Sequence, residues 1–211
     1  MTQPAAAPPE GRSAAKYTAI LRGATEVFLR EGYVRASVDA IAAAAGVGKQ
    51  TVYGHFGNKE RLFLAVVERV RAEAAGPGVW SNLIVDTGNP RADLEATGER
   101  LLRILLAPEV AALHRLTVAE LTHLPDLQRL WRDSDSTQTA IGLIADYLRE
   151  RDRAGDLLVP DPVLSAHQFS NLLGIEGRTR SMYGAQPITA AERATIAREV
   201  ADLIVRAHRR V

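Results

Sequence analysis

The chain of 211 residues contains no cysteine, which excludes a disulfide framework, a thiolate metal site and a thiol redox sensor. It also has no apolar run near the roughly 18 residues that a membrane-spanning helix requires. Residues 1–10 lack the basic start and long apolar stretch of a secretory signal, so we expect a cytoplasmic protein with no membrane partner.

Signals for catalysis and metal binding are missing as well. His114 and His123 are nine residues apart, which places them on roughly opposite faces of one helix, and no third ligand accompanies them. No Ser/His/Asp set or carboxylate pair follows a strand-turn-helix pattern. We therefore expect no metal, no cofactor and no enzymatic activity.

Lysine is scarce, and its distribution is uneven. Of the 26 basic residues only Lys16, Lys49 and Lys59 are lysines, all within residues 1–60. The formal net charge is only +1, so any binding of nucleic acid must depend on a local basic patch rather than on the charge of the whole molecule. Residues 1–60 carry seven basic against five acidic residues, an excess too small to identify a DNA-binding protein by itself.

The 46% of apolar residues recur with the spacing of amphipathic helices, and no alternating strand pattern competes with them. We predict an all-α fold of about nine helices. The Ala/Pro-rich residues 1–15 are predicted to be a disordered tail, and Gly76-Pro77-Gly78 is predicted to separate a first domain, 16–75, from a second, 76–211.

Helix ends are marked by capping residues and helix breakers. The expected helices run from 16 to Gly32, from Ser37 to Gly46, from Gly48 to His55, from Asn58 to Gly76, from Asn89-Pro90 through Leu105, from Pro108 to Leu124, from Pro125 to Gly155, from Asp161-Pro162 to about Tyr183, and from the capping box Thr189–Glu192 through Ala207.

The segment from Ser37 to Glu60 predicts a helix-turn-helix: a short helix, a tight turn at Gly46, a second short helix, and a capped start to a third. The second helix has the right diameter for the major groove of DNA. Its bracing residues are expected to be Ala42, Val47, Val52 and Phe56. The residues predicted to contact DNA are Ser37, Lys49, Gln50, Thr51, Tyr53, His55 and Lys59.

These side chains suit different contacts. Gln50 can pair with adenine and Thr51 with a thymine methyl group or a phosphate, whereas Tyr53, His55 and Lys59 are donors for phosphate oxygens. Lys59 also lies at a helix N-terminus, which favours an anion. Tyr53 and His55 have the alternative of a structural role within the domain. Arg12 and Lys16 could enter the minor groove as a basic arm, and the alternative is that both side chains are solvated.

The same segment resembles the signature of the tetracycline-repressor (TetR) family of transcriptional regulators. The resemblance rests on the Ala-Gly-Val turn at 45–47, Tyr53, His55-Phe56 and Lys59-Glu60, with Phe28, Gly32-Tyr33 and Ile41-Ala42 upstream. Gly48, Gly54 and Gly57 depart from the family pattern. Because glycine weakens helices, we predict that the recognition helix frays in the absence of DNA.

The resemblance implies a homodimeric DNA-binding repressor whose C-terminal helical domain binds a small-molecule effector and pairs through its last two helices. Helical bundles hold ligands between helices. The candidate pocket residues are His114, Trp131, Tyr147, His167, Gln168 and Asn171, each alternatively a core or rim residue. The candidate dimer-interface residues are Ala166, Phe169, Leu173, Ile196, Val200, Leu203 and Ile204, each alternatively internal core.

The sequence therefore predicts a regulator that binds a pseudo-palindromic operator and is released by an effector. One alternative is a helical interaction protein with a structural helix-turn-helix. The other is a P-loop NTPase, suggested by Gly46-Val-Gly-Lys-Gln-Thr. That motif requires a glycine where Ala43 lies and a Ser or Thr where Gln50 follows the lysine, so the NTPase is the weaker alternative.

Overall fold

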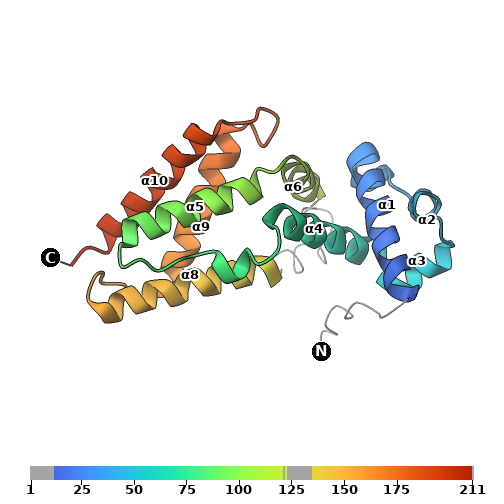
Figure 1. Ribbon diagram of the computed structural model, residues 1–211. Helices are drawn as coiled ribbons and strands as arrows, with labels where there is room; N and C mark the ends of the chain where they lie inside the picture. The colour runs from blue at the N-terminus through green and yellow to red at the C-terminus, as the bar shows by residue number, and fades with distance from the viewer. Residues whose placement is uncertain (1–11, 121, 123–134, 211) are drawn as a thin grey trace. The chain divides into compact units, whose positions relative to one another are not determined.

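The computed structural model describes residues 12–120, 122 and 135–210 (Figure 1). Within these ranges every regular element is a helix, which confirms the predicted all-α fold. The elements are α1 (Arg12–Arg35), α2 (Val38–Ala45), α3 (Lys49–Phe56), α4 (Lys59–Ala75), the short 3-10 helix η1 (Trp80–Asn82), α5 (Pro90–Leu105), α6 (Pro108–Glu120), α8 (Asp135–Ala154), α9 (Pro162–Arg180) and α10 (Ala190–Ala207).

Two of the expected segments differ from the structure or extend beyond it. Residues 12–15, expected in the tail, form the first turn of α1. The helix expected from Pro125 is described only from Asp135 onward as α8, and residues 123–134, with His123 and Trp131, lie outside the described residues.

Contacts divide the described chain into two compact units. The first unit contains residues 12–69, 116–120 and 122, and the second contains residues 70–115 and 135–210. The division therefore falls inside α4 and inside α6, whereas the sequence places a domain boundary after Ala75. A boundary inside a continuous helix is not marked by helix-breaking residues in the sequence. The sequence therefore placed the boundary at the helix breaker after α4, which is Gly76-Pro77-Gly78.

The core of the first unit forms around the apolar face of α1. Ile20, Ala24 and Phe28 are completely buried on this face. Gly32 interrupts the helix with φ of +79°, a conformation that favours glycine, so the predicted helix end is confirmed although one further turn follows it. A β-carbon at Gly23 would lie 2.9 Å from the backbone nitrogen of Ala45, so glycine is required for the close approach of α1 and α2.

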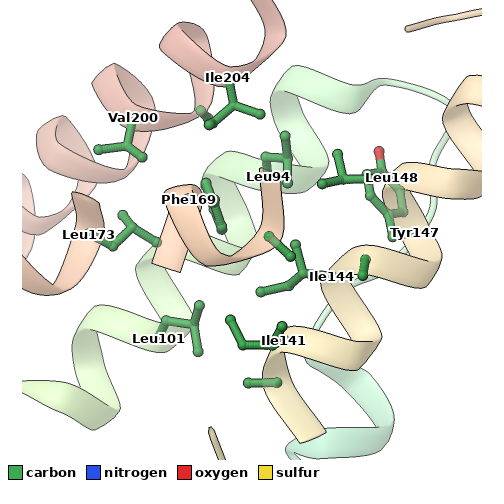
Figure 2. Close-up of a cluster of buried hydrophobic side chains, with 14 of the residues drawn as sticks. Leu94, Leu101, Ile141, Ile144, Tyr147, Leu148, Phe169, Leu173, Val200 and Ile204 are labelled. Carbon is green, nitrogen blue, oxygen red and sulfur yellow. The ribbon is translucent and has the colours of Figure 1, made fainter. Parts of the chain in front are cut away.

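The second unit is a bundle in which α5, α8, α9 and α10 pack around one core (Figure 2). The predicted caps start three of these helices: Asn89 Oδ1 accepts from Ala92 N at 3.2 Å, Asp161 Oδ1 accepts from Leu164 N at 2.9 Å, and Thr189 forms a capping box with Glu192. Side chains from all four helices point toward one another in Figure 2.

Most of the residues expected at a dimer interface belong to this core. Six of them are at most 5% exposed, and they are Ala166, Phe169, Leu173, Ile196, Val200 and Ile204. They pack within the chain because small residues let the helices approach closely: a β-carbon at Gly98 on α5 would lie 3.1 Å from Ala197 Cβ and 3.2 Å from Leu173 Cδ2. These six therefore take the alternative role of internal core, and of this set only Leu203, 53% exposed, is available to a partner.

Candidate nucleic-acid interface

The helix-turn-helix has the local geometry that the sequence predicts. Ser37 Oγ accepts a hydrogen bond from Ala40 N at 3.0 Å and caps α2. Gly46 ends α2 in the left-handed region, with φ of +65° and ψ of +33°. Gly48 precedes α3 and has no side chain, so it makes no side-chain capping bond. The first backbone N–H groups of α3 therefore have no side-chain acceptor at the N-cap position.

Recognition helix α3 is braced on one side by apolar contacts. Val52 and Phe56 are 2% and 7% exposed, and Ala42 on α2 is also buried. Tyr17 on α1 stacks on Phe56 with ring centroids 4.8 Å apart, a contact that the sequence did not reveal. Val47, expected to brace the helix too, is half-buried.

The opposite side of α3 is open. Lys49, Gln50 and Tyr53 are exposed, Tyr53 to 43%. Thr51 and His55 are half-buried, and His55 contacts the edge of Tyr17 at a centroid distance of 6.0 Å. The face that α3 presents therefore consists of Lys49, Gln50 and Tyr53, with Thr51 and His55 at its margins.

Lys49 is paired inside the motif. Its ammonium donates a hydrogen bond to Asp39 Oδ2 on α2 at 2.8 Å, and this bond and the carboxylate charge raise the pKa of Lys49. Both side chains are exposed, so the ion pair is weak and leaves Lys49 available to a stronger anion such as a phosphate.

Lys59 is held more firmly than the sequence suggests. Its ammonium donates to Ala36 O at 3.0 Å and to Val34 O at 3.3 Å, and it lies 4.4 Å from the centre of the Tyr33 ring. Burial lowers the pKa of Lys59. Lys59 therefore joins the start of α4 to the end of α1, and its role as a phosphate anchor remains a prediction that would require it to share or exchange these partners.

The other basic residues near the N-terminus lie on a helix. Arg12 and Lys16 belong to the first turns of α1, and Lys16 is exposed. A minor-groove arm is normally an extended segment. The structure therefore favours the alternative that Lys16 is solvated.

The candidate pocket residues do not converge on one described site. The hydroxyl of Tyr147 is buried and donates to Asp93 Oδ2 at 2.7 Å, so it is already satisfied within the core. Gln168 and Asn171 are exposed on α9, and His167 is half-buried there. His114 on α6 is half-buried, and burial followed by the charges of nearby arginines lowers its pKa to about 4.

A shallow groove lies elsewhere, between α5 and the start of α10, and its lining includes Glu95, Glu99, Arg100, Arg103 and Arg193. It contains none of the candidate pocket residues. Among the described residues, no three His, Cys, Asp or Glu side chains are grouped as metal ligands. No described helix is long and apolar enough to cross a membrane.

Parts of the chain are similar to proteins that have been named. It is 35% identical over 92 residues to the DNA-binding transcriptional repressor TetR of Mycobacteroides abscessus, covering 44% of this chain and 45% of that protein. It is 48% identical over 50 residues to the HTH-type transcriptional activator FasR of Mycolicibacterium smegmatis, covering 24% and 23%. The chain thus spans less than half the length of these curated relatives.

Similarity to solved structures extends over nearly the whole chain. A TetR-family transcriptional regulator from Mesorhizobium loti is 27% identical, with a TM-score of 0.78 over 95% of this chain and 100% of that one. The flavonoid-responsive regulator FrrA is 25% identical, with a TM-score of 0.72 over 92% and 97%.

Two family descriptions match the chain. Residues 20–66 match the bacterial regulatory proteins of the tetR family, and residues 92–210 match the C-terminal domain of AefR-like transcriptional repressors. The first match contains the braced and capped helix-turn-helix, and the second contains the α5–α10 bundle. The chain therefore belongs to the TetR family of transcriptional regulators.

Proposed function

We propose that this protein is a transcriptional repressor that binds operator DNA as a homodimer and is released by a small-molecule effector. The observation that carries the proposal is the geometry of α3, which is braced by Val52 and Phe56 and exposes Lys49, Gln50 and Tyr53. We assign DNA binding to residues 16–75, effector binding and dimerisation to residues 76–211, and the cytoplasm as the compartment.

The exposed face of α3 suggests separate roles in DNA binding. Gln50 and Thr51 are proposed to read base edges, because an amide pairs with adenine and a threonine methyl group packs on thymine. Tyr53 and His55 are proposed to contact phosphates, with Ser37 at the N-terminus of α2. Lys49 is proposed to exchange Asp39 for a phosphate on binding, since the ion pair is exposed and weak.

Fluorescence anisotropy with DNA from the region upstream of the gene tests the proposal. We expect binding whose affinity falls by about tenfold or more between about 50 and 200 mM salt, and a clear preference over scrambled DNA. Gln50→Ala should reduce that preference by about 1–3 kcal/mol, because an amide pair with a base is lost.

Gln138→Ala is the matched control, since it removes an exposed amide from α8 in the other unit, outside the faces of α9 and α10. It should leave the preference unchanged. Absence of binding to any DNA at low salt would rule out the regulator. A reporter gene behind the upstream DNA then separates repression from activation, because deletion of a repressor raises expression.

A second copy of this chain is the proposed partner of α9 and α10. Exposed residues recur on α9 at a spacing of three to four, and two of them are the large apolar residues Leu164 (52% exposed) and Ile175 (62% exposed). Leu203 (53% exposed) adds a third on α10. Gln168 and Asn171 lie on the same face of α9, so we now propose them as interface residues rather than pocket residues.

A further inference from the structure

The lysine of the recognition helix is already paired with a carboxylate from the neighbouring helix. Lys49 Nζ on α3 lies 2.8 Å from Asp39 Oδ2 on α2, and the two side chains are 49% and 68% exposed. Both residues belong to the first unit, and the pair bridges the two helices of the helix-turn-helix. The ion pair is therefore part of the element that is proposed to bind DNA.

Asp39 supplies a negative charge that α3 itself lacks. The first turn of α3 contains no acidic residue, and its N-cap, Gly48, has no side chain. Lys49 is the first residue of α3, where the partial positive charge of a helix N-terminus disfavours a second positive charge. The carboxylate of Asp39 offsets this arrangement from the preceding helix. Asp39 Oδ2 thus occupies a place beside the Lys49 ammonium that a phosphate oxygen would take in a complex with DNA.

The small excess of positive charge in the N-terminal part makes this pairing important. Residues 1–60 carry seven basic and five acidic residues, so each charge is a large share of the balance. Binding to DNA of arbitrary sequence depends almost entirely on positive charge near the phosphates. Pairing Lys49 with Asp39 therefore removes one positive charge from that kind of binding.

The ion pair is weak enough to open when a phosphate is held beside it. An exposed ion pair is worth about twofold to fivefold in an equilibrium constant. On an operator, base contacts of Gln50 and Thr51 would fix α3 and hold a phosphate next to Lys49, which raises the effective concentration of that phosphate. On DNA of another sequence no base contact fixes α3, so the carboxylate on the neighbouring helix remains the partner of the ammonium.

We propose that Asp39 is a specificity-determining residue, which masks Lys49 from DNA of arbitrary sequence so that Lys49 binds a phosphate only on the operator. The inference rests on the proposed function, because it concerns how the regulator selects its operator. It assigns this selection to a carboxylate, a group that by itself is repelled by DNA.

The salt dependence of DNA binding by the full chain tests the masking. Asp39→Asn keeps the shape of the side chain and removes its charge. For scrambled DNA, the slope of log affinity against log salt should steepen by about 0.9 per bound protomer, and the affinity at about 0.1 M salt should rise about eightfold per protomer. For the upstream DNA the slope should stay unchanged, because Lys49 already contacts a phosphate there, and the affinity should rise by at most about fivefold per protomer. The preference for the upstream DNA therefore falls.

Glu26→Gln is the matched control, because Glu26 on α1 is 67% exposed and lies 2.8 Å from Arg30 in the same unit. This variant changes the net charge by the same amount, while Arg30 keeps Glu31 as a partner at 2.8 Å. It should change the slope for scrambled DNA by less than about half as much as Asp39→Asn does. Equal steepening in both variants would show an effect of net charge alone and would overturn the inference.

Removal of the lysine provides an independent readout. Lys49→Gln should make the slope for the upstream DNA shallower by about 0.9 per protomer and leave the slope for scrambled DNA unchanged. In the Asp39→Asn background, the same change should also cancel the steeper slope for scrambled DNA, because the unmasked charge is then absent. A shallower slope for scrambled DNA in Lys49→Gln alone would contradict the masking.

Retention on immobilised heparin separates this inference from the proposed function, because heparin is a polyanion without an operator sequence. Asp39→Asn should elute at a higher salt concentration than wild type and Glu26→Gln, and Lys49→Gln should cancel that increase. If the protein binds no DNA at low salt, the regulator and the selection of an operator both fail, and heparin alone decides whether Asp39 masks Lys49. If it prefers its upstream DNA but Asp39→Asn leaves both slopes unchanged, the regulator stands and the inference fails.

Discussion

Asp93 orders the segment before α5 through several hydrogen bonds to one buried carboxylate. It accepts from Thr87 N at 3.1 Å, from Thr87 Oγ1 at 2.5 Å and from Tyr147 Oη at 2.7 Å. Burial alone would raise the pKa of Asp93, but the bonds from Thr87 and Tyr147 outweigh it and lower the pKa. The charged form is therefore the one that the fold stabilises.

Replacing this carboxylate should destabilise the second unit. We expect Asp93→Asn to lower the free energy of unfolding by about 1–3 kcal/mol, because the amide nitrogen cannot accept the bonds that the carboxylate oxygen accepts. Because the pKa of Asp93 is lower in the folded state, its contribution is complete above the unfolded pKa and is lost as the pH falls through the folded value.

Urea unfolding across the acidic range measures both effects. Asp146→Asn is the control, because the Asp146 side chain is 72% exposed and, within the part of the chain that the structure describes, pairs with its helical neighbour Arg149. Its unfolding free energy should differ from wild type by less than about 0.5 kcal/mol. An equally stable Asp93→Asn would show that the carboxylate does not order the segment.

Lys59 shows at the same scale why a residue type does not define a role. Its position at the start of α4 predicts a phosphate contact, yet its bonding partners lie 23 and 25 residues earlier in the chain. The sequence shows the helix N-terminus, which is local. It does not show the carbonyl groups of Val34 and Ala36, because only the packing of α1 against α4 brings them to the ammonium.

At the scale of the element, α3 combines a well-braced side with weak ends. It has no side-chain cap at Gly48 and contains Gly54 in its interior, where an added β-carbon would have nothing within 4 Å. Gly57 ends it with φ of +77°, so this glycine is required by the backbone. Gly54 and Gly57 are close in sequence but opposite in their tolerance of a side chain.

Alanine at these two positions should have opposite effects. Gly54→Ala should stabilise the free protein by about 1 kcal/mol because the β-carbon meets no neighbour and alanine favours the helix. Gly57→Ala should destabilise it by about 1 kcal/mol because alanine resists positive φ. Thermal unfolding measures both, and effects of the same sign would contradict the assignment.

Amide hydrogen exchange measures the fraying that the glycines predict. Residues 48–55 should exchange quickly in the free protein and slowly with operator DNA bound, and Gly54→Ala should slow exchange in the free protein. Equal protection with and without DNA would show that α3 is already fully formed before binding.

At the scale of the whole molecule, the exposed face of α9 predicts the assembly. Ile175→Glu places a charge among the exposed apolar side chains of α9 and α10, which would be desolvated between two copies. We therefore expect a shift from dimer toward monomer in light scattering, together with weaker operator binding because each half-site is then bound alone.

Val85→Glu is the control, because Val85 is 48% exposed in the segment between η1 and α5 and belongs to neither α9 nor α10. It should remain dimeric. A wild-type protein that is monomeric at all concentrations, or an Ile175→Glu variant that is fully dimeric, would exclude this face as the interface.

The sequence by itself determined the all-helical fold, most of the helix ends and the family. Ser37, Asn89, Asp161 and Thr189 cap helices through bonds to residues three positions away, so local pattern is sufficient to place them. The helix-turn-helix is equally local, because its turn and its bracing residues lie within one short segment.

Only the tertiary structure decided which helix faces are internal and which groups meet across the chain. The residue pattern of α9 and α10 is the same whether their apolar faces pack on α5 or on a second copy of the chain. The structure shows that Phe169 and Val200 are buried in the core, whereas Ile175 and Leu203 are exposed. The hydrogen bond from Tyr147 to Asp93 likewise requires α8 and α5 to meet. Such meetings depend on long-range packing, which residue spacing along one helix does not encode.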